Sequence, residues 1–502
     1  MILALSQRAR DAVIAGALGI ASFILLFVRY WWPPDKIFDE VYFARAAEEY
    51  LQRRYIYENT HPPVTKLLIT LSVILFGGLQ HGDTSYGWRF FNVLAGAIAI
   101  PICFFLAKRI TRSTLFGAYA AILFALDGMH YVQSRIATPE GFVVCFSMLT
   151  LYAFCRYWDA VVDAPPSAAT PRSLLVRALV FAGCVVAAVV VVFVRFRAEI
   201  LAAQIVLVVA IAATLYAGDR LFHDRPAGSR WLVAFAFAGA LLVASKWYGV
   251  MAYGVAAVVI AYASVRAWQA RRASPFPVDL VLATVLSTIG IVYALAYIPH
   301  FIGLRDLQTL PPRPYTVSDI VTMQVNAFLY HAHLRATHPY ASAWWTWPLE
   351  LRPALYYANY GGTCPNCTAA MIYSLPNPLL LWLGLATVPL VGWLAFRQRN
   401  RGYGLVVLAY LMQWVPWAFS PRIAFIYHFY VNVPLIAICN AVGMQFVLER
   451  MGKWDPRASR WIVAGYLVLV ALAFIYFFPI LSAIPILQSE WQQRLWLPSW
   501  KG

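Results

Sequence analysis

The sequence is short of charge, and above all of acidic residues. Only 12% of its 502 residues are charged, against about 25% in soluble proteins, and 22 acidic residues stand against 39 basic ones. With 62% hydrophobic residues and a mean hydropathy of +0.66, this composition excludes a soluble globular domain. The short alternating segments of a membrane β-barrel are also missing. Long apolar stretches follow one another instead, so we expect an all-α polytopic membrane protein.

Cysteine is scarce as well, and its placement does not suggest a disulfide framework. Cys364 and Cys367 lie in a loop, where a local disulfide, two free thiols and a metal site are the alternatives. Zinc would need four ligands, and the sequence has no second Cys-x-x-Cys. We therefore favour the disulfide and expect no metal. The other five cysteines lie in apolar stretches, as small hydrophobic residues: Cys103, Cys145, Cys155, Cys184 and Cys439.

The net charge of +17 does not indicate a nucleic-acid partner, because Lys and Arg flank the apolar stretches as the positive-inside rule predicts. Arg8 and Arg10 place the N-terminus in the cytoplasm. The first apolar segment has no small-residue cleavage site, so we expect it to stay as an anchor. That span ends at an aromatic belt, Tyr30-Trp31-Trp32.

The segment 66–79 decides the topology. It is apolar but has only about fourteen residues, which is short for a span. If it crossed the membrane, Lys108, Arg109 and Arg112 would lie outside. We expect a juxtamembrane helix in the interface instead, which leaves these cations inside. About thirteen transmembrane spans follow, at 12–30, 88–107, 114–130, 140–158, 174–194, 199–217, 231–245, 247–265, 278–299, 376–396, 403–419, 424–447 and 461–485.

We expect the chain to form a single membrane domain, 1–502, with two large outer regions. The first outer loop is 31–87, and the second is 300–375, rich in Trp, Tyr, His and Pro. The sequence shows no internal repeat. A transporter or flippase, which often has inverted repeats and charges near the bilayer midplane, is therefore disfavoured.

Several ionisable residues fall at the outer ends of the predicted spans. Such residues are costly at membrane depth and are candidates for function, the alternative being snorkelling or paired side chains. They are Asp39, Glu40, Lys66, Arg89, Arg135, Glu140, Arg195, Arg197, Glu199, Lys246 and Arg422.

A lipid-linked sugar phosphate would explain this set of charges. Lys66, Arg89, Lys246 and Arg422 could gather around the donor phosphate and stabilise its charge as it leaves. Phosphate is a good leaving group, so one carboxylate suffices to take the proton from an acceptor hydroxyl, unlike the two that a glycosidase needs.

Asp39 and Glu40 both fit that base. Adjacent carboxylates repel, which would raise one pKa toward a useful range. Twenty-one residues later, His61 could bind the phosphate or the acceptor, with Pro62 and Pro63 fixing the turn. For Asp39 taken alone, capping of a helix is the alternative.

These motifs resemble the protein O-mannosyltransferase family. The resemblance covers most of the chain. It rests on Ile37 to Phe43, on His61 to Lys66, on Tyr86 to Phe90, on Leu126 to Glu140 with its Ser134-Arg135 pair, on Ser245 to Gly249 and on Tyr330 to Leu349. Three features depart from the family pattern or its eukaryotic form: Tyr42 stands where His is usual, Glu140 replaces Asp, and no MIR domain follows Pro299. The chain therefore resembles bacterial members.

The resemblance implies the GT-C membrane fold and a polyprenyl-phosphate-mannose donor. It implies that Asp39 is the base and Glu40 its neighbour. It also implies that Arg89, Arg135 and Lys246 hold donor or acceptor, and we add Glu140 to that set. The spans around 195–199 look like an extra hairpin.

The second outer loop supplies weaker candidates. Trp344, Trp345 and Trp347 are either an interfacial belt or a platform for sugar or acceptor. His331 and His428 could face the same cavity as Arg422, with structural histidines as the alternative.

We therefore expect an inverting glycosyltransferase of the cell membrane with its active site on the outer face. It would move mannose from a polyprenyl phosphate to Ser or Thr of a protein, amid membrane lipids. The alternative acceptor is lipid A or a cell-envelope glycan, as in aminoarabinose transferases. No cofactor is expected, although Asp39 and Glu40 could hold a divalent metal.

Overall fold

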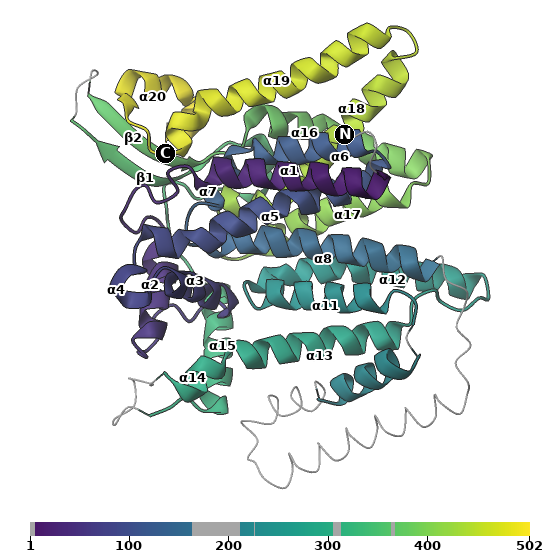
Figure 1. Ribbon diagram of the computed structural model, residues 1–502, viewed down its shortest axis with the longest axis horizontal. Helices are drawn as coiled ribbons and strands as arrows, with labels where there is room; N and C mark the ends of the chain where they lie inside the picture. The colour runs from purple at the N-terminus through teal and green to yellow at the C-terminus, as the bar shows by residue number, and fades with distance from the viewer. Residues whose placement is uncertain (1–5, 163–210, 225, 305–312, 363–366, 502) are drawn as a thin grey trace.

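The computed structural model of the protein describes residues 6–162, 211–224, 226–304, 313–362 and 367–501 (Figure 1). In these segments, nine helices are long and apolar enough to cross a membrane. They are α1 (Gln7–Phe27), α5 (Ser85–Thr111), α8 (Pro139–Val162), η4 with α12 (Trp247–Gln269), α13 (Val278–Ala296), α16 (Pro378–Arg397), α17 with η6 (Arg401–Phe419), η7 with α18 (Ile426–Met451) and α19 (Pro456–Leu481).

Two further predicted spans are shorter apolar helices, α6 (Thr114–Ala125) and α11 (Ser229–Val243). The predicted span 174–194 and most of 199–217 lie outside the described residues, as do Arg195, Arg197 and Glu199. Every other predicted span coincides with a helix. The predicted helical, polytopic architecture is therefore confirmed for the described residues.

The helices pack as a bundle whose two ends differ. At the left end in Figure 1, the first outer loop contributes α2 (Glu40–Leu51), α3 (Val64–Leu75) and α4 (Gly78–His81), next to α14 (Ile298–Ile302). From the rest of the chain come α7 (Gly128–Gln133), α15 (Val317–His333), η5 (Trp344–Leu349) and α20 (Gln488–Arg494).

A small sheet, which the sequence did not lead us to expect, lies at the same end. Strands β1 (Ala354–Tyr360), β2 (Thr368–Ser374) and β3 (Ile486–Leu487) are antiparallel in the order β1-β2-β3. The ring of Phe38 stacks on Tyr356 of β1, with 3.9 Å between ring centroids. The sheet thereby joins the second outer loop to the first.

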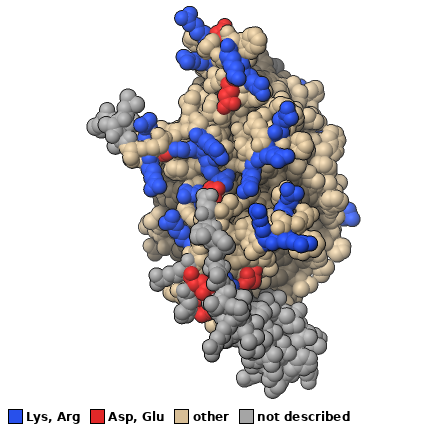
Figure 2. Space-filling view, turned by 90° about the vertical axis from the view of Figure 1, so that its right-hand side faces the viewer, with Lys and Arg blue, Asp and Glu red and all other residues tan. Residues whose placement is uncertain are grey.

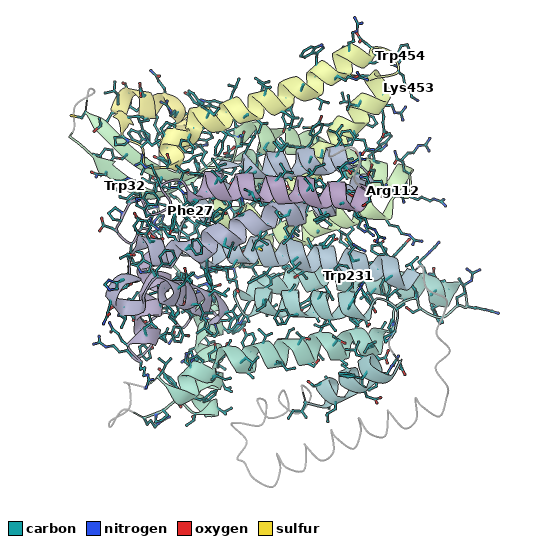
Figure 3. The ribbon with its side chains drawn as sticks, viewed as in Figure 1. Phe27, Trp32, Arg112, Trp231, Lys453 and Trp454 are labelled. Atoms are coloured by element: carbon teal, nitrogen blue, oxygen red, sulfur yellow. The ribbon has the colours of Figure 1, made fainter. Side chains whose placement is uncertain are left out.

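The prediction that the segment 66–79 does not cross the membrane agrees with the structure, in which α3 does not run across the bundle. Asp11 near the start of α1 pairs with Lys108 near the end of α5, so these two helix ends lie together. Figure 3 shows Phe27 and Trp32 at one end of the bundle and Arg112 at the other. Residues between α1 and α5 therefore begin and end on the same side.

Cations gather at the end opposite the first outer loop. Figure 2 shows Lys and Arg side chains spread over this face with few acidic ones. Helices α5, α12, α16 and α18 all have basic residues in their last turn: Lys108, Arg109, Arg266, Arg397 and Arg450. The positive-inside rule predicts this distribution for a cytoplasmic face.

Cysteine labelling tests the topology. Arg54 and His81 are exposed on either side of α3, and Lys453 lies at the opposite end. We expect Arg54→Cys and His81→Cys to react with an impermeant maleimide from one side of the membrane, and Lys453→Cys only from the other. Labelling of positions 54 and 81 from opposite sides would show that α3 crosses.

Candidate active site

Asp39 and Glu40 are adjacent in the sequence, but the start of α2 gives their two carboxylates different surroundings. Phe38 has a positive φ of 49°, and its ring is held on Tyr356. Asp39 occupies the N-cap position of α2, but its side chain makes no capping hydrogen bond. The helix-capping alternative for Asp39 is therefore wrong, and its carboxylate is left for another role.

Glu40 is a structural residue. Its side chain is fully buried and accepts four hydrogen bonds: two from Arg89 at 2.7 Å each, one from the Ile37 amide at 3.0 Å and one from the Ala137 amide at 2.8 Å. A carboxylate with both oxygens so occupied is not available to take a proton. The prediction that Glu40 shares the catalytic role gains no support from this geometry.

Arg89 is fully hydrogen-bonded inside the protein. Its remaining N–H groups donate to the carbonyls of Tyr30, Pro33 and Asp35 at 2.7–3.2 Å. All five donors of this guanidinium are thus used inside the protein. Arg89 ties α5 to the first outer loop, and this geometry gives no support to its predicted role as a phosphate ligand.

Lys66 is likewise saturated, by a residue that the sequence argument missed. Its ammonium group donates to the side chain of Glu58 at 2.9 Å, to the Glu58 carbonyl at 2.6 Å and to the His61 carbonyl at 2.8 Å. Lys66 therefore holds the turn, and this geometry gives no support to its predicted role as a phosphate ligand. Glu58 is buried and belongs to no recognisable motif. The only sequence signal for its role is that it is an acidic residue close to the predicted site lysine.

Glu58 also orients His61. Its carboxylate lies 2.9 Å from His61 Nδ1, which directs the other ring nitrogen away. Burial opposes ionisation of Glu58, but the charge of Lys66 and the contacts with His61 and Thr60 hold the pKa of that carboxyl well below its usual range. His61 lines a cavity of about 420 Å³. The predicted site histidine is thus retained, with Glu58 as its support.

Four other predicted residues line the same cavity: Lys246, His331, Arg422 and His428. Lys246 is buried and pairs with the buried Glu140, over 100 residues earlier in the chain. This is the one hydrogen bond of Lys246 among the described residues, so two of its N–H groups are free for a ligand. The cavity therefore brings together cations from distant parts of the sequence.

Arg422 completes the cationic wall. Its guanidinium contacts His331 Nδ1, while His331 Nε2 lies 3.0 Å from the Thr60 carbonyl. This geometry requires the neutral tautomer with the proton on Nε2. Burial and the charges of His61 and Arg422 lower the pKa of His331 to about 4, so the ring stays neutral. Arg422 has no carboxylate partner in the described part of the chain.

The carboxylate of Asp39 differs from those of its neighbours in having no hydrogen-bond partner within the described residues. Burial, together with the negative charge of Glu140, raises its pKa to about 7, against the opposing charge of Lys246. Arg422 is also near enough to lower this pKa. A carboxylate that titrates near neutrality beside two cations fits a general base.

Three predicted residues lie elsewhere. Arg135 donates to the carbonyls of Val28 and Arg29 and to the Tyr131 hydroxyl, so it caps the end of α1. Its substrate-binding role stays a prediction. Trp347 is fully buried, with its indole N–H donating to Ser342, and Trp345 is more than half exposed outside the cavity. Neither is a sugar platform in the cavity.

The remaining predictions are partly visible. Trp347 stacks behind His428 with ring centroids 6.1 Å apart, so it supports the cavity wall. Cys367 is disulfide-bonded, and Cys364 lies outside the described residues. Among the described residues, no group of three or more His, Cys, Asp or Glu is placed to hold a metal.

Comparison with known proteins identifies relatives over the whole chain. The dolichyl-phosphate-mannose-protein mannosyltransferase model matches residues 16–208. The model for the C-terminal four-transmembrane region of protein O-mannosyltransferase matches residues 316–500. Together they cover well over half of the chain.

The polyprenol-phosphate-mannose–protein mannosyltransferase of Mycobacterium tuberculosis is 27% identical, over 99% of this chain and 93% of its own length. Its counterpart in Mycolicibacterium smegmatis is also 27% identical, over 99% and 94%. The solved Saccharomyces cerevisiae Pmt1-Pmt2 complex bound to the sugar donor matches with a TM-score of 0.70 and 12% identity, over 98% of this chain and 92% of that one. The GT-C fold is thus confirmed.

The two adjacent carboxylates should respond differently to loss of charge. Glu40→Gln leaves Arg89 buried and partly unpaired, which should lower the free energy of unfolding by about 3–5 kcal/mol. Asp39→Asn breaks no hydrogen bond and should change it by less than about 0.5 kcal/mol. Thermal unfolding of the purified proteins in detergent measures both. Equal losses of stability would contradict the division of roles.

Proposed function

Because the chain belongs to the protein O-mannosyltransferase family, we propose that it is an inverting enzyme that moves mannose from a polyprenyl phosphate to a Ser or Thr hydroxyl of a protein. The names of the mycobacterial relatives support the donor and the protein acceptor. The observation that carries the catalytic assignment is Asp39, an unpaired carboxylate with a pKa of about 7 beside the cationic cavity.

Asp39 accepts the proton of the acceptor hydroxyl as its oxygen attacks the anomeric carbon. The bond from that carbon to the phosphate oxygen breaks on the opposite face, which inverts the configuration. The phosphate departs as an anion and needs no proton, so one carboxylate is enough. This step needs a neutral acceptor hydroxyl and an ionised Asp39. Because the pKa of Asp39 is near 7, a large fraction of its carboxylate is ionised at neutral pH.

Lys246 and Arg422 bind the donor phosphate and stabilise its growing charge. Each has N–H groups without a partner within the described residues, unlike Lys66 and Arg89. His331 holds the Arg422 guanidinium, and His61 presents its free ring nitrogen to the cavity. Glu140 keeps Lys246 in place while lifting the pKa of Asp39.

We assign the site to the outer face of the cell membrane. The cations at the opposite end of the bundle support this orientation. We also propose that the reaction uses the lipid-linked donor without a cofactor. Glu40 could not join Asp39 as a metal ligand, because its oxygens already accept four hydrogen bonds.

Replacement of Asp39 tests the base. Membranes containing Asp39→Asn should transfer labelled mannose from polyprenyl-phosphate-mannose to a Ser/Thr peptide about 10²–10⁴ times more slowly than the parent. Asp35→Asn is the matched control, since Asp35 is an exposed acid in the same loop. Unchanged activity of Asp39→Asn would remove the assignment, and transfer to a glycolipid but not to peptide would select the glycan acceptor.

The pH profile tests the environment of Asp39. Its base form is lost as pH falls through the pKa, so kcat/KM should drop about tenfold per pH unit below about 7 and level off above it. Glu140→Gln removes a neighbouring negative charge and should move this inflection to lower pH. Asp35→Asn should leave it in place. An inflection that ignores Glu140→Gln would show that another group titrates.

A further inference from the structure

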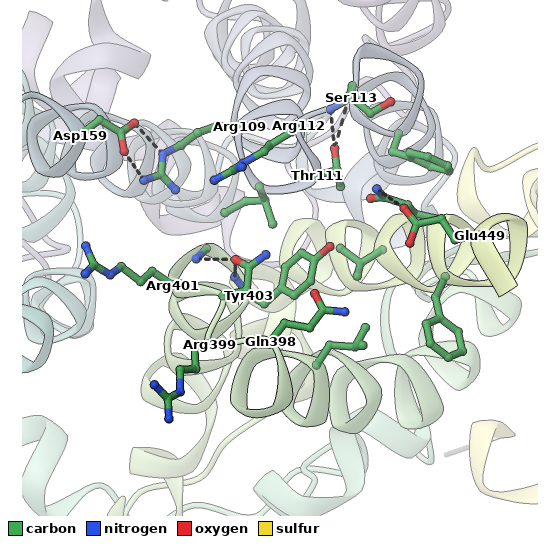
Figure 4. Close-up of a pocket in the computed structure, with 18 of the residues that line it drawn as sticks. Arg109, Thr111, Arg112, Ser113, Asp159, Gln398, Arg399, Arg401, Tyr403 and Glu449 are labelled. Atoms are coloured by element: carbon green, nitrogen blue, oxygen red, sulfur yellow. Dashed lines mark hydrogen bonds and ion pairs between the residues drawn. The ribbon is translucent and has the colours of Figure 1, made fainter. Parts of the chain in front are cut away.

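A second cavity lies at the opposite end of the bundle from Asp39. It has a volume of about 1110 Å³ and opens between the ends of α5 and α18 and the turn that joins α16 to α17 (Figure 4). A cavity of this size can hold a whole lipid headgroup. Nothing in the proposed transfer reaction uses it.

Four arginines line this cavity, with only two carboxylates. Arg109 pairs with Asp159 at 2.6 Å. Arg112, Arg399 and Arg401 have no carboxylate partner in the parts of the chain that the structure describes. Figure 4 shows the Arg112 side chain extending between the Arg109–Asp159 pair and the turn before α17. The second carboxylate, Glu449, accepts a hydrogen bond from Gln445. With four arginines and two carboxylates, the lining has a net charge of +2.

The rest of the lining is amphipathic. Hydroxyl and amide groups lie beside the arginines, from Ser113, Gln398 and Tyr403. Apolar side chains such as Phe116 and Phe446 also line it, and they belong to helices of the membrane bundle. A soluble anion would use only the polar part, whereas a phospholipid would use both its headgroup and its glycerol and acyl region.

The positive-inside rule accounts for the sign of this face but not for the cavity. Elsewhere on the same face a cation can be neutralised locally, as Lys108 is by Asp11. Here three arginines from two separate segments line one cavity, and none of them has a carboxylate partner among the described residues. Basic pockets between spans at the cytoplasmic side suit anionic lipid headgroups.

We propose that this cavity binds the phosphate headgroup of an anionic phospholipid. Arg112 and Arg401 contact the phosphate, and the apolar lining receives the chain region of the lipid. The proposal is independent of the transfer reaction, because the cavity lies at the far end of the bundle from the cationic cavity beside Asp39.

Lipid titration of the purified full-length protein tests this site. We expect phosphatidylglycerol in mixed micelles to raise the apparent melting temperature with saturation, and phosphatidylcholine to have no such effect. The double substitution Arg112→Gln with Arg401→Gln should weaken the apparent affinity about ten- to thirty-fold, since each cation contributes about one kcal/mol. The control is Lys453→Gln with Arg457→Gln, which removes two exposed cations of the same face outside the cavity.

Each result decides the matter. Saturable stabilisation that the cavity variant loses and the control variant keeps supports the site. Equal weakening in both variants would show attraction to the charged face as a whole and overturn it. Stabilisation by inorganic phosphate that equals that of the lipid would replace the phospholipid with a soluble anion, and no stabilisation by phosphatidylglycerol would also overturn the proposal.

Discussion

The buried ion pair between Glu40 and Arg89 is the constraint on which the proposed site depends. It joins the start of α2 to α5, and through the Ala137 amide to the turn before α8. Each partner is completely hydrogen-bonded, which compensates for the cost of burying both charges. With Glu40 held in this way, its neighbour Asp39 lies at a fixed place beside the cationic cavity. The proposed base is thus positioned by an adjacent residue whose own carboxylate is fully hydrogen-bonded.

A second buried cluster does the same for the histidine turn. Glu58 binds Lys66 and His61 together, so the turn through Pro62 and Pro63 is held by charge as well as by proline. Both clusters pair buried charges that would be costly to leave unpaired near the bilayer. Within the described residues, the Asp39 carboxylate has no hydrogen-bond partner, and Lys246 and Arg422 keep unused N–H groups. The proposed site therefore lies where the internal pairing is incomplete.

The two ends of the bundle divide the charge differently. At the end of the proposed site, the charges around Asp39 are buried and mostly matched, so that individual pKa values can be shifted by their neighbours. At the other end, most arginines of the described segments have no carboxylate partner. This asymmetry is what the positive-inside rule predicts for a cytoplasmic face, and it leaves a basic cavity suited to a lipid headgroup.

The sequence by itself determined the membrane class, the course of the spans and the motif residues from which the site is built. It did so because hydrophobic length and the Lys and Arg bias act locally along the chain. It also placed segment 66–79 correctly, through the charges that follow it.

Which charges pair was decided only by the tertiary structure. Arg89 and Lys66 looked as free as Lys246 and Arg422 in the sequence, because their partners were either hidden in the catalytic motif, as Glu40 was, or overlooked, as Glu58 was. Burial demands that a charge be compensated, but the partner is set by distances in space between residues as far apart as 40 and 89.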